Sequence, residues 1–406
     1  MRNIIHDHLR RASIKPWCLS VALIASLVGC ATFATPEQAK PEWLTVVSRT
    51  LMDGQSDDLL TAGMGMGPLI GQGAAPRYAD PLKPTASELR RAAIYARNDP
   101  TGGFSRLFGP NIDPVSRQPV QDARIAGEEV LAYSHDAGVG HVSAAMLLQI
   151  PASFDASSPC ILAVPATGSA RLYADLHRVG GWGLRRNCAV VYTDKGQANG
   201  IHDLDSDTVT AVDGRRVDAA AVGAASHFTA PMNGATREAF QRKNPHRVAF
   251  KHAHSRQNSD ATWGREVVRS IQFAFHELNQ RYFTLGKPLT RANTLVIVTG
   301  NSNGGGAALL GAEFDREGWI DGVVAAQPQV QPEASNQVVI ERGSRQWRGG
   351  GRSLVDYFTE TILYQACAAM ATPAAWRTNE ISFGANRCTS LKEKGLLRSD
   401  TLADQA

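Results

Sequence analysis

The sequence predicts an α/β fold with a mostly parallel sheet and helices on its faces, and two observations carry this prediction. Short, nearly continuous apolar runs, which are typical of strands buried on both faces of a sheet, recur between residues 161 and 325. Segments with helical spacing of apolar residues separate the later runs. This alternation of strand, helix, strand, helix and strand is the pattern of a parallel sheet with crossover helices.

The first predicted strands form a hairpin. Residues 130–133 and 144–150 are apolar runs, and the connection 134–140 between them is rich in turn residues. The preceding region, 35–125, is rich in glycine, proline and polar residues, and we interpret it as loop-rich. Its glycine-rich stretch at 63–68 lacks the lysine and the flanking strand of a phosphate-binding loop, so we interpret it as a plain loop.

Strand-like runs continue at residues 161–164 and 189–192, with a short helix predicted between them over 170–184. Residues 196–258 differ, because they are polar, hold scattered histidines and aspartates, and show no sustained periodicity. We interpret this segment as an insertion over the sheet that forms part of a lid.

Regular elements return after the insertion. Apolar residues at helical spacing predict a helix over 262–283. A strand at 295–298, a small-residue helix at 303–314 and a strand at 322–325 follow it. A further helix is predicted over 354–370.

The N-terminal 34 residues are predicted to be an export signal. Basic residues up to Lys15 precede an apolar stretch, Leu19–Val28, that is too short to span a bilayer as a mature helix. The sequence around Cys30 resembles a bacterial lipobox, so a lipid on this cysteine would anchor the mature protein, as in an outer-membrane lipoprotein. Simple secretion with cleavage near Ala34 is the alternative, and in both cases we expect a secreted or periplasmic protein.

Charge excludes one class of partner. In the first 29 positions four basic residues outweigh one acid, so this segment holds three of the four net positive charges and leaves about +1 for the rest. A nearly neutral body offers no basic surface for nucleic acid. No nucleic-acid partner is therefore expected, and membrane attachment is expected only through Cys30.

Four cysteines follow the predicted signal, an even number that permits two disulfides in an oxidising compartment. The sequence leaves all three pairings open. Buried free thiols are the alternative, above all for the two cysteines that each open an apolar run. The four are Cys160, Cys188, Cys367 and Cys388.

The segment that carries chemistry joins the strand at 295–298 to the helix at 303–314. It contains the pattern G-x-S-x-G with Ser302 at its centre. In a sharp strand-to-helix turn the central residue is strained, small neighbours let strand and helix approach, and the hydroxyl stands above the sheet edge. The helix N-terminus below the site favours an anion. The pattern predicts a nucleophilic serine of the α/β-hydrolase type; a glycine-rich turn without chemistry is the alternative.

Two backbone N–H groups are predicted to form the oxyanion hole. One belongs to Asn303, directly after the nucleophile, and the other to Gly168 in the loop after the strand at 161–164. Ser302, deprotonated by a histidine, would attack an ester carbonyl while these donors hold the oxyanion, and water would then release the acid. Neither a metal nor an organic cofactor is implied.

Two candidate metal sites are rejected on their spacing. Residues 202–207 resemble the start of a calcium loop, but Thr208 stands where glycine is needed and Gly214 where a bidentate glutamate is needed. His252 and His254 have no third ligand, so they are better interpreted as surface histidines of a polar insertion. No metal site is therefore predicted.

Several segments add to the serine motif: Thr299–Gly306, Ala325–Pro328, Pro165–Ala170, Tyr192–Gly196 and the opening around Thr61–Gly67. In these segments the chain resembles the D-(−)-3-hydroxybutyrate oligomer hydrolases of poly(3-hydroxybutyrate)-degrading bacteria. The resemblance implies a carboxylesterase that splits dimers and short oligomers of (R)-3-hydroxybutyrate into monomers. It also implies that the serine of the first segment is the family's nucleophile.

Two other functions stay open. Another exported carboxylesterase, of the tannase or feruloyl-esterase type, would share the serine motif, and turnover of hydroxybutyrate dimer against aryl esters separates the two. A lipid-anchored binding protein would carry the motif without catalysis, and reaction with an organophosphonate would exclude it.

The catalytic acid and base are not found in the usual order, in which both follow the nucleophile. No histidine follows Ser302, and the last one is His276. Neither Asp194 nor Asp321 stands at the position of a triad acid.

The members of the resembled family are also considerably longer than 406 residues. We therefore expect residues 126–406 to be an α/β-hydrolase-like catalytic domain that is incomplete at its C-terminal side. The alternative is that His202 or His227 reaches Ser302 from the insertion at 196–258.

Overall fold

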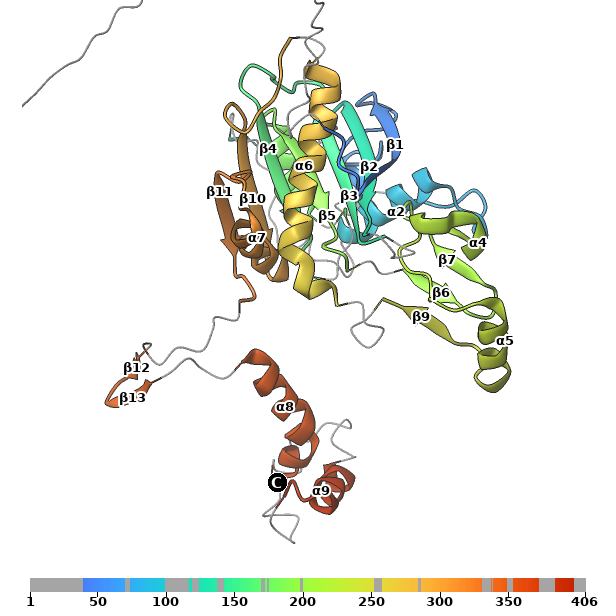
Figure 1. Ribbon diagram of the computed structural model, residues 1–406, viewed down its shortest axis with the longest axis vertical. Coiled ribbons are helices and arrows are strands. Elements are labelled where there is room, and N and C mark those ends of the chain that lie inside the picture. Colours follow the sequence, from blue (N-terminus) through green and yellow to red (C-terminus); the bar gives the residue numbers. More distant parts are fainter. Residues whose placement is uncertain are drawn as a thin grey trace, which may run out of the picture.

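The computed structural model places most of the chain in a main body around a seven-stranded sheet, with a four-stranded sheet beside it (Figure 1). A two-stranded hairpin and two helices from the C-terminal part stand apart from this body in the same view. The described residues are 39–69, 74–98, 117–118, 124–136, 142–168, 172–173, 175–197, 200–251, 258–283, 286–330, 337, 339–348, 353–371 and 384–397.

The seven-stranded sheet has the order β1-β2-β3-β5-β4-β10-β11. β5, β4, β10 and β11 are parallel to one another, as the alternation of strands and helices predicts. β1, β2 and β3 pair antiparallel, and β3 is antiparallel to β5, so the sheet is mixed. The strands are β1 (Leu44–Met52), β2 (Gly127–Ser134), β3 (Ala144–Pro151), β4 (Cys160–Pro165), β5 (Ala189–Thr193), β10 (Leu295–Asn301) and β11 (Gly322–Ala326).

Helices cover both faces of the sheet. α6 and α7 lie on one face, where Figure 1 shows α6 in front of the sheet and running roughly along its strands. α1, α2 and the short helical turns after β4 pack on the other face. The helices are α1 (Met66–Leu69), α2 (Ala86–Asn98), the π-helical turn η2 (Leu176–Gly180), α3 (Gly181–Leu184), α6 (Trp263–Tyr282) and α7 (Asn303–Phe314).

The hydrophobic core has two layers because successive side chains of a strand point to opposite faces. In β3, Met146 and Leu148 pack on the layer that holds α6, whereas Ala145 and Leu147 pack on the opposite layer. All four are fully buried. Since a buried leucine or methionine stabilises by roughly 1.5–3 kcal/mol relative to an exposed one, these strands form the stable centre of the fold.

Helices α6 and α7 pack closely through glycines. A β-carbon at Gly264 would lie 2.4 Å from the Leu310 carbonyl oxygen, and one at Gly311 would lie 2.7 Å from Cγ1 of Val267. Neither position has room for a side chain unless the helices move apart. The small residues of α7 therefore set its distance from α6.

Regular elements also occur in the region 35–125, which the sequence predicts to be loop-rich. β1 pairs with β2, but only its two end residues are buried, so it lacks the alternation that marks a half-buried strand. Helix α2 follows a capping box, in which Thr85 Oγ1 accepts from Glu88 N at 3.3 Å and Glu88 Oε2 accepts from Thr85 N at 2.8 Å. This local signal was present in the sequence.

The predicted insertion at 196–258 holds a second sheet, of order β8-β7-β6-β9. Its strands have three residues each, which is too short for periodicity to reveal them. Figure 1 shows this sheet beside the main body and not in front of the large sheet. Its elements are β6 (Ile201–Asp203), β7 (Thr208–Thr210), β8 (Arg216–Asp218), α4 (Ala219–Val222), the 3₁₀ turn η3 (Gly223–Ala225), α5 (Gly234–Lys243) and β9 (Val248–Phe250).

Two short units follow β11. One is the hairpin of β12 and β13, and the other pairs α8 with α9. The predicted helix at 354–370 corresponds to α8 and the turn after it. The bounds are β12 (Val339–Arg342), β13 (Arg345–Arg348), α8 (Leu354–Ala368), the 3₁₀ turn η7 (Ala369–Ala371) and α9 (Gly384–Glu393).

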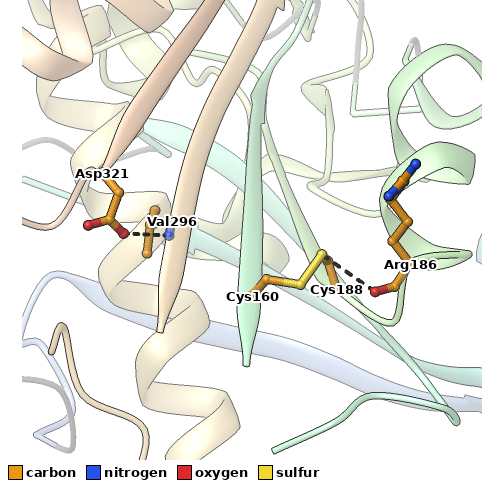
Figure 2. The surroundings of a disulfide bond; sticks show 5 residues. All are labelled: Cys160, Arg186, Cys188, Val296 and Asp321. Carbon is orange, nitrogen blue, oxygen red and sulfur yellow. Dashed lines mark hydrogen bonds between the residues drawn. A yellow bond between two sulfur atoms is a disulfide. The ribbon is translucent and has the colours of Figure 1, made fainter. Parts of the chain in front are cut away.

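The four downstream cysteines form two disulfides. Cys367–Cys388 joins α8 to α9, and Cys160–Cys188 joins the first residue of β4 to the residue before β5. The structure thus selects one of the three pairings and excludes free thiols for Cys160 and Cys188. Figure 2 shows the second bridge at the amino end of the parallel strands, near Asp321.

Residues 1–34, with Cys30, lie outside the described part of the chain, so export and lipidation stay predictions. Among the helices that the structure describes, none is both long and apolar enough to cross a membrane.

Candidate active site

Ser302 stands at the turn between β10 and α7, at the carboxyl edge of the parallel strands. Its backbone has φ 57° and ψ −127°, a conformation that residues with a β-carbon rarely adopt. The residue is exposed. The predicted strand, serine turn and helix are therefore all present, and α7 begins at Asn303 as predicted.

Glycines allow this turn to close. A β-carbon at Gly300 would lie 2.2 Å from the Gly304 carbonyl oxygen, and one at Gly304 would lie 2.6 Å from the carbonyl oxygen of Pro165. The backbone of α7 thus touches both the strand before it and the loop after β4. Because only glycine permits these approaches, the G-x-S-x-G pattern has a steric cause here.

A second segment, residues 326–329, encloses the turn from the other side. Ser302 N donates to the Ala326 carbonyl oxygen at 3.0 Å, and Gln329 N donates to the Ser302 carbonyl oxygen at 3.1 Å. A β-carbon at Gly306 would lie 2.3 Å from the Gln329 carbonyl oxygen. The amide of the serine itself is therefore occupied and is not a donor for a bound anion.

The loop after β4 lies against α7 and holds the second predicted oxyanion donor. Ala166 N donates to the Thr193 carbonyl oxygen at 2.9 Å, and Thr167 N donates to Asp175 Oδ2 at 2.9 Å. Gly168 has φ 62°, so a glycine suits this position. Within the described residues, the N–H groups of Gly168 and Asn303 donate no hydrogen bond. Both predicted donors are thus open to a ligand.

The side-chain oxygen of Asn303 also lacks a hydrogen-bond partner among the described residues. Its Oδ1 atom is buried and accepts no hydrogen bond from the residues that the structure describes. A buried acceptor without a partner is uncommon in folded proteins.

Lys195, which the sequence analysis assigned no role, lies beneath the loop after β4. It follows β5, its side chain is fully buried, and its Nζ donates to the carbonyl oxygens of Ala166 and Gly168, the latter at 3.1 Å. The contact spans nearly thirty positions of sequence, so no local pattern signals it.

The two aspartates discarded as triad acids are both engaged elsewhere. Asp194 is buried, and its Oδ1 accepts from Ala145 N at 2.9 Å and Gly196 N at 2.8 Å; burial raises the pKa of this carboxyl group. Asp321 Oδ2 accepts from Val296 N at 2.8 Å, at the opposite end of β10 from Ser302 (Figure 2). Both carboxylates therefore accept hydrogen bonds from backbone N–H groups and fix the backbone at these positions.

His202 is held inside the small sheet, where both of its ring nitrogens have partners. Its Nδ1 accepts from Ala230 N at 3.1 Å, and its Nε2 lies 2.9 Å from Asp207 Oδ1. Since Nδ1 accepts, the proton of the neutral ring sits on Nε2 and points at the aspartate. His227 lines a cavity of about 50 Å³ in which Asp194 also stands. No hydrogen bond joins Ser302 to a histidine in the described part of the chain.

Among the described residues, no group of three or more His, Cys, Asp or Glu side chains lies close enough together to hold a metal ion. His252 and His254 lie outside them. Asp203, at the start of the discarded calcium loop, caps the turn by accepting from Asp205 N at 2.9 Å.

Comparisons with known proteins agree with one another. A family model described as 3HB-oligomer hydrolase matches residues 24–406. The D-(-)-3-hydroxybutyrate oligomer hydrolase of Albidiferax ferrireducens is 42% identical over 98% of this chain, and that of Polaromonas naphthalenivorans is 42% identical over 95%. The protein of the same name from Burkholderia pseudomallei is 40% identical over 89% of the chain.

The chain spans 58%, 57% and 54% of the lengths of these three relatives. No solved structure matches it.

Proposed function

The chain belongs to the 3HB-oligomer hydrolase family, and on that premise we propose that it is a serine esterase that cleaves the ester bonds of 3-hydroxybutyrate dimers and oligomers. The relatives carry this substrate in their names. Ser302 is the proposed nucleophile, and the product is the monomeric hydroxy acid.

The turn at Ser302 is the observation that carries this proposal. A residue with φ 57° between a parallel strand and a helix is strained, and strain of this kind is kept where function requires it. The sheet order supports an α/β-hydrolase-like fold, because β4 lies directly beside β10 and brings its loop to the serine.

The chemistry follows from the positions of the backbone donors. The Ser302 hydroxyl, its proton taken by a general base, attacks the ester carbonyl carbon. The N–H groups of Asn303 and Gly168 then stabilise the negative charge on the former carbonyl oxygen. The N-terminus of the twelve-residue helix α7 adds its partial positive charge. The alcohol leaves, and water releases the acid from the acyl-enzyme.

We also propose that the protein works outside the cytoplasm. The apolar stretch Leu19–Val28 supports an export signal, and two disulfides among the described residues suit an oxidising compartment. Intact-mass analysis of the protein from a Gram-negative host tests this. A mature N-terminus at Cys30 with a diacylglycerol adduct is the lipoprotein outcome, one near Thr35 is the secreted outcome, and an unprocessed Met1 contradicts export.

The central experiment combines labelling and turnover. In the full-length protein a fluorophosphonate should form one adduct, on Ser302, and Ser302→Ala should abolish the adduct and lower hydrolysis by a factor on the order of 10⁵ or more. Ser157→Ala, which changes an exposed serine before β4, serves as the matched control and should keep both. Normal turnover by Ser302→Ala would contradict the proposal, and a folded protein without any adduct would favour a binding protein.

Substrate class is tested separately with the same preparation. We expect hydrolysis of the hydroxybutyrate dimer to exceed that of methyl ferulate and methyl gallate. The reverse preference would retain the esterase and assign it to the aryl-ester class.

A further inference from the structure

Lys195 has an unusual environment for a lysine. Its side chain is fully buried, its backbone is left-handed with φ 61°, and its Nζ lies 5.3 Å from the centre of the Trp263 ring. A buried ammonium group is costly unless hydrogen bonds compensate it. Two of those bonds go to backbone carbonyls of one short loop, those of Ala166 and Gly168. Lys195 therefore ties this loop to the end of β5.

Asp175 holds the same loop from the other side. Its Oδ2 accepts from Thr167 N at 2.9 Å and its Oδ1 accepts from Thr167 Oγ1 at 3.1 Å. The peptide between Ala166 and Thr167 is thus held at its carbonyl by Lys195 and at its N–H by Asp175. The next peptide carries the N–H of Gly168, and the peptide after it is again held by Lys195 through the Gly168 carbonyl. The free N–H is therefore placed between two fixed peptides.

From this geometry we propose that Lys195 is a positioning residue for the oxyanion hole, which it orients by fixing both carbonyls that flank the Gly168 N–H. The inference rests on the proposed function of Ser302 and adds to it. Lys195 is buried and does not itself contact substrate. Its positive charge beneath the loop also favours the negative charge that develops on the substrate oxygen.

The charge state of Lys195 makes the strength of its hydrogen bonds to the loop depend on pH. Asp194, Asp175 and Asp260 face it and favour the charged form, but burial outweighs them and lowers the pKa of Lys195 to about 8. Above that pH the amine is neutral, and its bonds to the loop lose the strength that charge gives them. We expect kcat to fall as pH rises through about 8, with KM nearly unchanged, because the hole acts on the transition state.

As pH rises through about 8, the free energy of unfolding should increase while kcat falls. The folded protein releases this proton near pH 8, whereas the unfolded chain keeps it up to about 10.4. Between these values the unfolded state binds more protons, so this group makes the protein more stable as pH rises. A role in stability alone would make activity follow stability, so the opposite trend identifies positioning.

Lys251 provides a matched control. Its Nζ also donates to two backbone carbonyl oxygens, those of Val142 at 2.8 Å and Ser143 at 3.1 Å, and burial also lowers its pKa. It faces Asp194, Glu266 and Asp136 and makes no hydrogen bond to the loop at Gly168 that the structure records. Replacing either lysine removes a buried cation from the same region, but only one of them holds the oxyanion loop.

The test compares Lys195→Met with Lys251→Met in hydrolysis of the hydroxybutyrate dimer and in hydrogen exchange. Lys195→Met should lower kcat about 10- to 100-fold, change KM less than twofold and lose the fall above pH 8. Its Thr167 N–H, which donates to Asp175 in the parent protein and belongs to the peptide that Lys195 holds, should exchange faster than in the parent protein. Lys251→Met should lower only the melting temperature. Equal loss of kcat in both variants, or unchanged exchange at Thr167 in Lys195→Met, would overturn the proposal.

Two further measurements keep the outcomes separable. If the parent protein forms no fluorophosphonate adduct, the proposed function fails, while exchange at Thr167 still decides whether Lys195 holds the loop. If Lys195→Met does not fold, Asp175→Ala takes its place, because it removes the acceptor of Thr167 N and should lower kcat by the same mechanism. A kcat that rises with stability through pH 8 in the parent protein would contradict the role of Lys195.

Discussion

The two ends of the parallel strands are held together in different ways. At the amino end side chains make the links: Cys160 is bridged to Cys188, and Asp321 accepts from Val296 N. At the carboxyl end the backbone itself makes the contacts around Ser302, and glycines leave the space for them. The same strands therefore have an amino end linked by side chains and a carboxyl end at which glycines keep side chains out of the close backbone contacts around Ser302.

Of the changes that test this difference between the two ends, adding one methyl group at the carboxyl end should have the largest effect on kcat. Gly304→Ala would place a β-carbon 2.6 Å from the Pro165 carbonyl oxygen and 3.0 Å from that of Ala166. The loop with the Gly168 donor must then move. Because the loss of one oxyanion donor costs about 10²–10³ in kcat, we expect a fall of that order with little change in KM.

Gly311→Ala is the control for this change. It adds the same methyl group to the same helix, 2.7 Å from Cγ1 of Val267 and away from the site. We expect it to lower the melting temperature and leave kcat within about twofold, since overpacking costs roughly 1–3 kcal/mol of stability. A larger loss of kcat in Gly311→Ala than in Gly304→Ala would contradict the contrast between the two ends.

At the amino end the largest effect should come from removing the Cys160–Cys188 bridge. The bridge closes a loop with a sequence separation of 28, so its loss should lower the free energy of unfolding by about 3–4 kcal/mol in the chain-entropy estimate. We expect Cys160→Ser with Cys188→Ser to lower the urea midpoint while kcat of the folded fraction stays the same. A selective loss of kcat at full folding would show that the two ends are coupled.

The insertion offers a third region for comparison. His202→Ala should leave the Ala230 N–H without its acceptor and destabilise the small sheet by about 1–3 kcal/mol, whereas Asp207 keeps its ion pair with Arg237. We expect Ser302 to react with a fluorophosphonate as before, because His202 is engaged inside the insertion. Loss of the adduct without loss of folding would make His202 the base after all.

The smallest effect is expected at Asp321. Asp321→Ala removes the acceptor for Val296 N at the exposed start of β10, so we expect a cost of about 1 kcal/mol and unchanged turnover. Chemical denaturation measures the first and dimer hydrolysis the second.

The structure of the turn at Ser302 was predicted from the sequence because its signals are local. Gly300, Ser302 and Gly304 lie within five positions, and the bounds of α7 at Asn303–Phe314 agree with the predicted helix. The place of Gly168 followed from its position after a buried strand. What joins these segments was not predictable, since the contacts of Lys195 and Asp175 depend on how distant turns meet.

Other elements escaped prediction for identifiable reasons. β1 is buried only at Leu44 and Met52, so its apolar pattern does not show that it pairs with β2. The strands around His202 are three residues long and are stabilised by their neighbours. Disulfide pairing was open because spacing does not decide which cysteines meet in space.

The place of β10 in the sheet has a consequence for how the molecule folds. β4 pairs on one side with β5, which follows within thirty residues, and on the other side with β10, where Leu295 meets Cys160. The chain between Cys160 and Leu295 is far longer than the connection between β4 and β5, so closing it costs more entropy, and contacts between distant parts of a chain form slowly. We therefore expect strands β2 to β5 to assemble first and β10 to dock later on the open edge of β4. Until that step the turn at Ser302 lacks its contact with the loop after β4, so a newly made chain completes the proposed active site late.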